Sequence, residues 1–222
     1  MESAQTFSFI DSTLGKKVVM AVSGFVLFGF ALAHMAGNLQ VYLGPDALNA
    51  YGASLHALLH GTGLWIARLT LLGAVAAHIW AAVSLAGRNR GARQERYKVN
   101  APRASTYASR TMIWSGPLLL LFIVYHLLHF TTGHVHPRFQ EGDVYQNLVI
   151  GFQQPAVAGF YIVAMVALGL HLYHGVWSLM QSLGLAHSRW NPLRHSVATF
   201  FAAVIVVGNI SFPVAVLTGF VK

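Results

Sequence analysis

The sequence predicts an all-α integral membrane protein, a bundle of five transmembrane helices. Three observations support this: 55% of the 222 residues are hydrophobic, only 9% are charged, and several apolar runs exceed 20 residues. A soluble domain carries roughly 25% charged residues, so lipid has to cover most of this surface. Inside a bilayer the backbone must be paired within helices or a closed barrel, and long apolar runs without strict alternation are typical of helices.

Each predicted helix is long enough to cross a hydrocarbon core of about 30 Å at about 1.5 Å per residue. No linker, low-complexity tract or internal repeat divides the chain, so residues 1–222 are expected to form a single membrane domain. We expect no removable signal peptide, because no small-residue cleavage site follows a short apolar run near the N-terminus. The predicted spans are 17–43, 61–87, 111–133, 155–185 and 195–221.

Basic residues predict the orientation of the spans. Seven Lys or Arg lie between the second and third spans, whereas none lies between the first and second. Because basic loops stay on the cytoplasmic side, the N-terminus is expected to be cytoplasmic and the C-terminus to lie on the outer side of the cell's inner membrane. Topology thus accounts for the net charge of +8 without a nucleic acid partner, although the basic face could also dock an acidic or soluble protein.

Histidine is the unusual residue of the predicted spans. The chain has 12 histidines, only 6 acidic residues and no cysteine, so cysteine-ligated clusters, disulfides and covalent haem attachment are excluded for this chain. An ionisable side chain deep in a membrane is costly and commonly functional. One alone could be an interhelical hydrogen-bond partner, but four helices carrying one each favour a shared cofactor. The deep histidines are His34, His78, His126, His171 and His174.

The depths of four of these histidines form two pairs. His34 lies 17 residues beyond Lys17 and His126 lies 16 residues beyond Arg110, in spans that run outward. His78 and His171 lie 17 and 16 residues into spans that run inward. A six-coordinate haem iron takes one imidazole from each side, so the sequence predicts two stacked b haems, the first pair binding the outer iron and the second the inner iron. Zinc, manganese or proton sites would be expected to include a carboxylate, and no predicted span contains one.

Motifs around these histidines resemble a known family over essentially the whole chain. They are Ser23-Gly24, Ala33-His34-Met35, Ala77-His78, Tyr125-His126-Leu127 and the stretch GLHLYHGVWS at 169–178. In them the sequence resembles the di-haem cytochrome b membrane-anchor subunit of succinate:quinone oxidoreductases and quinol:fumarate reductases. The resemblance implies a five-helix anchor with the same two haem pairs. It also selects His171 rather than His174 as the ligand, because in the family the ligand typically lies four residues before a Gly-(Leu/Val)-aromatic turn.

The resemblance implies a role in succinate dehydrogenase, respiratory complex II. Flavoprotein and iron–sulfur subunits would dock on the cytoplasmic face, and electrons from succinate would pass through the haems to a quinone, menaquinone by analogy. Quinol:fumarate reduction uses the same parts, but some of those reductases carry a Glu two residues before the helix IV ligand, where this chain has Gly169. This favours succinate oxidation. Without a flavin fingerprint or cysteine-ligated cluster, the chain is expected to be a subunit, not an enzyme alone, and its complex could form a higher oligomer.

Further side chains are candidates for contacts with a haem or a quinone. Arg68 requires a counter-charge, for which a haem propionate is preferred and snorkelling to the interface is the alternative. His129 and His174 each follow a predicted ligand by three residues, and either propionate contact or plain packing would explain them. His56 and His60 could line a quinone pocket or hold haem propionates, and exposed loop positions would equally explain them. Trp190 and Asn191 could contact a quinone or the iron–sulfur partner, or Trp190 could only anchor the chain at the membrane interface.

Two other functions stay open at this point. The same haem scaffold could serve a hydrogenase, another respiratory dehydrogenase such as formate dehydrogenase, or transmembrane ascorbate chemistry. A haem-free transporter could instead use the histidines for metal ions or protons. Substrate-driven haem reduction separates the first, and the presence of a Soret band excludes the second.

Overall fold

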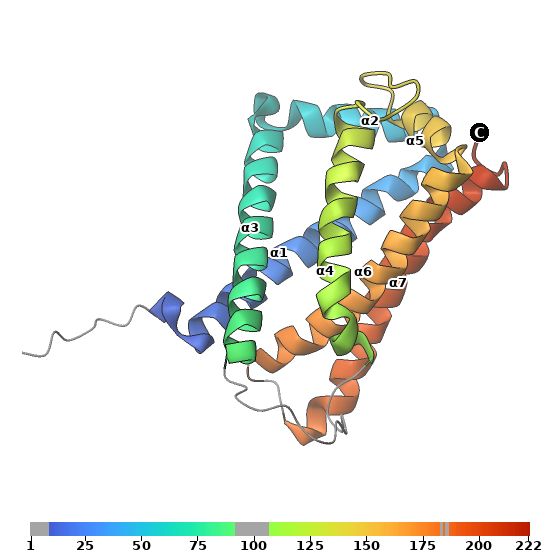
Figure 1. Ribbon diagram of the computed structural model, residues 1–222. Coiled ribbons are helices and arrows are strands. Elements are labelled where there is room, and N and C mark those ends of the chain that lie inside the picture. Colours follow the sequence, from blue (N-terminus) through green and yellow to red (C-terminus); the bar gives the residue numbers. More distant parts are fainter. Residues whose placement is uncertain (1–8, 92–106, 183, 185–186) are drawn as a thin grey trace, which may run out of the picture.

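The computed structural model describes residues 9–91, 107–182, 184 and 187–222. These residues form helices and no strand, and five helical segments are long and apolar enough to cross a membrane (Figure 1). The prediction of an all-α, five-span membrane protein is therefore confirmed. The long helices are α1 (Thr13–Asn38), α3 (Thr62–Gly91), α4 (Tyr107–His126), α6 (Pro155–Ser182) and α7 (Asn191–Leu217).

Several helix ends differ by three or four residues from the approximate span ends predicted by hydropathy. Helix α1 begins at Thr13 and not at 17, because the side chain of Ser12 accepts a hydrogen bond from the Gly15 N–H at 2.9 Å and caps the helix. Helix α7 begins at 191 and not at 195, since Pro192 suits a first helical turn. Hydropathy detects only the apolar part of a helix. Because the first turns of these helices contain polar residues, hydropathy places the helix starts several residues too late. The third span starts at 107 and not 111, the fourth helix ends at 182 and not 185, and the fifth ends at 217 and not 221.

Two short helices that the sequence did not predict, α2 (Pro45–Ala57) and α5 (Val144–Phe152), lie at one end of the bundle (Figure 1). Helix α2 follows Gly44, whose φ of 101° lets the chain turn sharply before Pro45. The carboxylate of Asp143 caps α5 by accepting a hydrogen bond from Gln146 N at 3.0 Å. Both helices are too short to span a bilayer.

Two histidines that the sequence places near the outer end of the second span lie outside helix α3, as predicted from the bounds 61–87. His56 belongs to α2, and His60 lies in the turn η3 (Leu58–Gly61). In that turn Leu59 and His60 have φ values of 50° and 55°, a left-handed backbone that breaks the helical path between α2 and α3.

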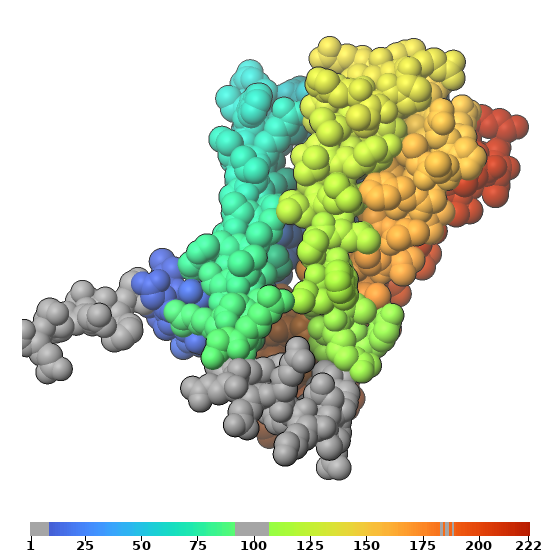
Figure 2. Space-filling view, viewed as in Figure 1, coloured from blue at the N-terminus to red at the C-terminus, as the bar shows by residue number. Residues whose placement is uncertain are grey.

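Four of the long helices surround a groove. Helix α3 packs on α1, α1 packs on α6, and α6 packs on α4, whereas α3 and α4 do not pack closely on each other. Helix α7 lies outside this set, against α6 and α1. Figure 2 shows the resulting hollow between α3 and α4, with atoms of α1 visible behind it. The interior of the four-helix set is therefore accessible from one side in the protein chain alone.

Side chains that face outward are largely apolar, as lipid contact requires. Phe25, Trp114 and Val207, on three different helices, are each more than 60% exposed. Helices approach closely where glycine removes the side chain: a Cβ on Gly169 of α6 would lie 2.5 Å from Val206 Cγ2 of α7. Such close approach is how helices associate when lipid is as apolar as their own side chains.

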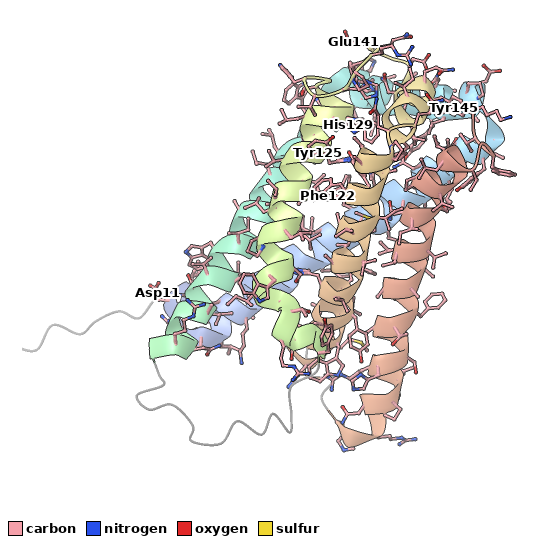
Figure 3. All side chains as sticks on the ribbon, turned by 45° about the vertical axis from the view of Figure 1, so that its right-hand side comes forward. Asp11, Phe122, Tyr125, His129, Glu141 and Tyr145 are labelled. Carbon is pink, nitrogen blue, oxygen red and sulfur yellow. The ribbon has the colours of Figure 1, made fainter. Side chains whose placement is uncertain are left out.

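Charged residues separate to the two ends of the bundle. The end where α1 begins and α3 ends, which we name the basic end, carries most of the described Lys and Arg. Asp11 lies at this end, and Glu141 lies at the opposite end beside α5 (Figure 3). The basic residues of this end are Lys16, Lys17, Arg88, Arg90, Arg110, Arg189 and Arg194. Four more that the sequence assigned to the same face, Arg93, Arg96, Lys98 and Arg103, lie outside the described residues.

Candidate functional site

The structure brings His34 of α1 and His126 of α4 together across the four-helix interior. Their ring centroids are 5.8 Å apart and the ring planes are inclined by 87°. We name them the outer pair. Phe30 stacks on His34 with centroids 5.2 Å apart. Helices α1 and α4 do not neighbour each other in the set, so the pair is a diagonal contact through its centre.

His78 of α3 and His171 of α6 form a second diagonal pair, which we name the inner pair. Their ring centroids are 6.1 Å apart and the planes are inclined by 55°. Gly24 of α1 makes room for this pair, because a Cβ there would lie 3.3 Å from His78 Cε1. The two diagonals cross the same interior at different heights.

The spacing of both pairs suits one metal ion between two imidazoles. A bond of about 2 Å from metal to imidazole nitrogen puts the centroids of two trans imidazoles on the order of 6 Å apart. No group of three or more His, Cys, Asp or Glu among the described residues could hold a metal ion. A two-imidazole arrangement of this kind fits a haem iron, whose other four ligands belong to the macrocycle, and does not fit a tetrahedral zinc site.

Hydroxyl groups hold three of the four imidazoles by their Nδ1 atoms. Ser23 Oγ donates to Val19 O at 2.6 Å and lies 3.2 Å from His78 Nδ1, so it accepts the imidazole N–H. Ser115 Oγ lies 3.4 Å from His171 Nδ1 in the same way. A hydrogen bond at one ring nitrogen orients the imidazole and leaves the other nitrogen free to bind metal.

The outer pair is held differently. Tyr161 OH lies 3.3 Å from His126 Nδ1, which leaves His126 Nε2 free. In His34, however, Nε2 itself lies 3.2 Å from Asn38 Nδ2. Binding of a metal through His34 Nε2 therefore requires the Asn38 amide to release this contact.

The spacing between the serine and the histidine is the same on α1 and α4. Eleven residues separate Ser23 from His34, and eleven separate Ser115 from His126. Eleven residues make about three helical turns and a rise of about 16 Å, so each serine and histidine share one face. The two pairs are therefore stacked about 16 Å apart along the interior. Ser23 entered the sequence analysis only as part of a motif and Ser115 not at all, although this repeated spacing was a usable signal.

His129 lies beside the outer pair and not in it. Its ring is completely buried (0% exposed), and Nδ1 lies 3.1 Å from the Tyr161 hydroxyl that also reaches His126. His136, which the sequence did not indicate as a site residue, lies nearby with its ring centroid 5.0 Å from that of His129 and the planes inclined by 32°. Its Nε2 donates to the carbonyl of Asn147 at 2.9 Å. Figure 3 shows Phe122 and Tyr125 on α4 and His129 beyond them, in the π-helical turn η4 (Leu127–Thr131) that continues α4. Tyr161 thus bridges the outer pair and a buried histidine cluster.

The other predicted site residues lie apart from the two pairs or beside the inner one. Arg68 is exposed on α3, and its guanidinium lies 5.1 Å from the centroid of the Trp65 ring. His56 and His60 are exposed, and His56 Nδ1 donates to Gly52 O at 2.9 Å. His174 Nδ1 is buried without a hydrogen-bond partner. Near the basic end Trp190 is exposed, whereas Asn191 Oδ1 accepts a hydrogen bond from Arg194 at 2.8 Å.

Comparison with known proteins gave one result. The model of the family described as succinate dehydrogenase/fumarate reductase transmembrane subunit matches residues 86–210, which is more than half of the chain. The matched segment contains His126 and His171, whereas His34 and His78 precede it. No curated protein and no solved structure gave a match.

Proposed function

The chain belongs to the family of succinate dehydrogenase/fumarate reductase transmembrane subunits, and from this premise we propose that it binds two b haems and carries electrons to a quinone. As a member of this family it is a multi-pass membrane subunit that associates with the catalytic subunits of its complex. The finer proposal is the anchor of a succinate dehydrogenase that receives electrons from an iron–sulfur subunit and reduces a quinone, menaquinone in our proposal.

The observation that carries this proposal is the presence of two imidazole pairs, 5.8 Å and 6.1 Å between centroids, across one membrane-spanning interior. When bound, a b haem supplies reversible one-electron chemistry at its iron. The four histidines of the two pairs would hold the haem irons, two imidazole nitrogens at each level. The hollow between α3 and α4 (Figure 2) supports an insertion of flat groups between the helices.

Ser23, Ser115 and Tyr161 act on the imidazoles and not on the metal. Each hydroxyl holds an Nδ1 atom and so selects the ring orientation and the tautomer of its histidine. Such contacts commonly raise the basicity of a metal-bound imidazole and reduce its freedom to turn away. Apolar helices around the interior exclude water, which affects the reduction potential of any bound haem iron.

The basic end suits the docking of the catalytic subunits. It carries the described cations Lys17, Arg88, Arg90 and Arg189, all exposed, and basic loops of membrane proteins stay in the cytoplasm. We therefore place the N-terminus and the catalytic subunits on the cytoplasmic side, with α2, α5 and the C-terminus on the outer side. Docking there puts an iron–sulfur subunit nearest the inner pair.

Helix packing at Gly169 supports succinate oxidation as the direction of the reaction. Helix α7 approaches so closely that any side chain at this position would meet Val206. The carboxylate that some fumarate reductases carry at the corresponding position would need a different separation of α6 and α7. Fumarate reduction with the same histidine pairs is the alternative direction.

A reduced-minus-oxidised visible spectrum with haem quantitation tests the proposal. We expect two low-spin b haems per chain in the purified complex, loss of one in His78→Ala, and loss of the other in His34→Ala. His56→Ala, which removes an exposed histidine of α2, is the control and should retain both. Wild-type protein without haem, or with a haem that neither substitution affects, would refute the proposal.

A further inference from the structure

Two buried cations near the basic end have no carboxylate beside them. Arg194 of α7 is 2% exposed and Lys16 of α1 is 8% exposed. Arg194 Nη1 and Nη2 donate to Asn191 Oδ1 at 2.8 Å and Trp177 O at 3.3 Å, but Nε is buried without a partner. Lys16 Nζ lies 5.4 Å from the centroid of the Trp80 ring, and within the described part of the chain no acidic side chain pairs with either cation.

A buried charge with only neutral neighbours is strongly destabilising. Cation–π contact offsets part of that cost: the Arg194 guanidinium lies 5.1 Å from the centroid of the Trp177 ring. Neutral partners do not neutralise the charge, however. Two buried cations near the same end of the bundle would therefore be stabilised by an anionic partner.

Both cations lie on the same side of the inner histidine pair. Trp177, whose carbonyl binds Arg194, follows His171 by six residues, a rise of about 9 Å along α6. Lys16 precedes Ser23, the partner of His78, by seven residues or about 10 Å along α1. The two cations thus belong to two different helices. Along each helix axis, the separation from the level of the inner pair is one that a long side chain and half the width of a haem together can bridge.

Unused N–H groups lie between the inner pair and Arg194. His174 Nδ1 and Trp177 Nε1 are both buried and without hydrogen-bond partners. The centroids of the His174 and Trp177 rings lie 6.1 Å apart. Both residues follow His171 on α6, and the Trp177 carbonyl accepts the hydrogen bond from Arg194. With Arg194 Nε of the neighbouring helix α7, three buried nitrogens lack a hydrogen-bond partner among the described residues. Such groups are unusual in a native protein, and an acceptor with several oxygens would satisfy them.

We propose that Arg194 and Lys16 bind the two propionate carboxylates of the haem held by the inner pair, with Trp177 and His174 as additional N–H donors. The inference rests on the proposed function and deepens it, since it orients the haem with its propionate edge toward the basic end. Arginine favours carboxylate through two parallel N–H···O bonds, and the Nε side of Arg194 is the side left free. The phosphate of a bound lipid is the other source of such an anion.

The test is a redox titration of the two haems in the detergent-extracted complex with its catalytic subunits. A nearby positive charge stabilises the reduced haem, so Arg194→Gln and Lys16→Gln should each lower the reduced-to-oxidised ratio of the inner haem about tenfold at a given potential. This corresponds to about 59 mV for one electron. The outer haem should not change, and Arg194→Lys, which keeps the charge, should shift the inner haem less than Arg194→Gln.

Arg138→Gln is the matched control, because Arg138 is exposed just before α5 at the opposite end of the bundle and its charge is screened by solvent. Loss of the inner haem alone from Arg194→Gln, with both haems kept in Arg138→Gln, would also support the proposal. An inner haem with unchanged potential in both variants would overturn it, as would equal shifts in the control. Loss of a tightly bound phospholipid, seen by mass spectrometry without a potential shift, would identify the lipid phosphate instead. A wild type without haem would refute the proposed function itself.

Discussion

Substitution of Ser23 by alanine should weaken haem binding at the proposed inner site and leave the proposed outer site intact. The hydroxyl lies 3.2 Å from His78 Nδ1, and its removal leaves a buried N–H without an acceptor. A buried donor left unpaired costs about 1–3 kcal/mol, which corresponds to an affinity loss of about 5- to 150-fold. Losses of about 10- to 100-fold are typical when the partner of a metal-bound histidine is removed. The helix itself should not suffer, because alanine is the best helix former.

Haem titration of the apoprotein, followed by the visible spectrum of each site, measures this effect. Ser54→Ala is the matched control: Ser54 lies in α2, and its hydroxyl donates only to the Tyr51 carbonyl at 2.7 Å. We expect the control to bind both haems with wild-type affinity. If Ser23→Ala binds the inner haem within twofold of wild type, the serine does not position His78 and the reasoning fails.

Three further changes test separate parts of the structure. Tyr161→Phe removes the hydroxyl that bridges His126 and His129, so the outer haem should bind about tenfold more weakly while the inner haem is unchanged; equal loss from both sites would contradict this role. Gly169→Ala should lower the thermal stability by about 1–3 kcal/mol through overpacking against Val206, whereas Gly175→Ala, in open space on the same helix, should be neutral or stabilising; similar melting temperatures for the two would refute the close contact. Growth without haem should yield a protein of lower melting temperature that rises with added haem, and a melting temperature indifferent to haem would count against both sites.

Much of the site could be anticipated because deep histidines are conspicuous in an apolar sequence. Helical rise converts residue number into depth, so counting residues was enough to associate His34 with His126 and His78 with His171, and the structure brings each pair together. Depth carries no information on direction around the helix axis. The sequence therefore could not decide what His129 and His174 contact, and it did not single out Arg194 as a buried cation.

The sequence by itself determined the membrane environment, the number of spans and the level of each deep histidine, since hydropathy and rise per residue are local properties of the chain. Only the tertiary structure decided which hydroxyls hold the imidazoles, that Arg68 is exposed while Arg194 is buried, and that α3 and α4 leave a hollow between them. These properties depend on how helices are rotated and inclined against one another. That arrangement follows from glycine contacts and side-chain packing summed over the whole bundle, which no single segment of sequence contains.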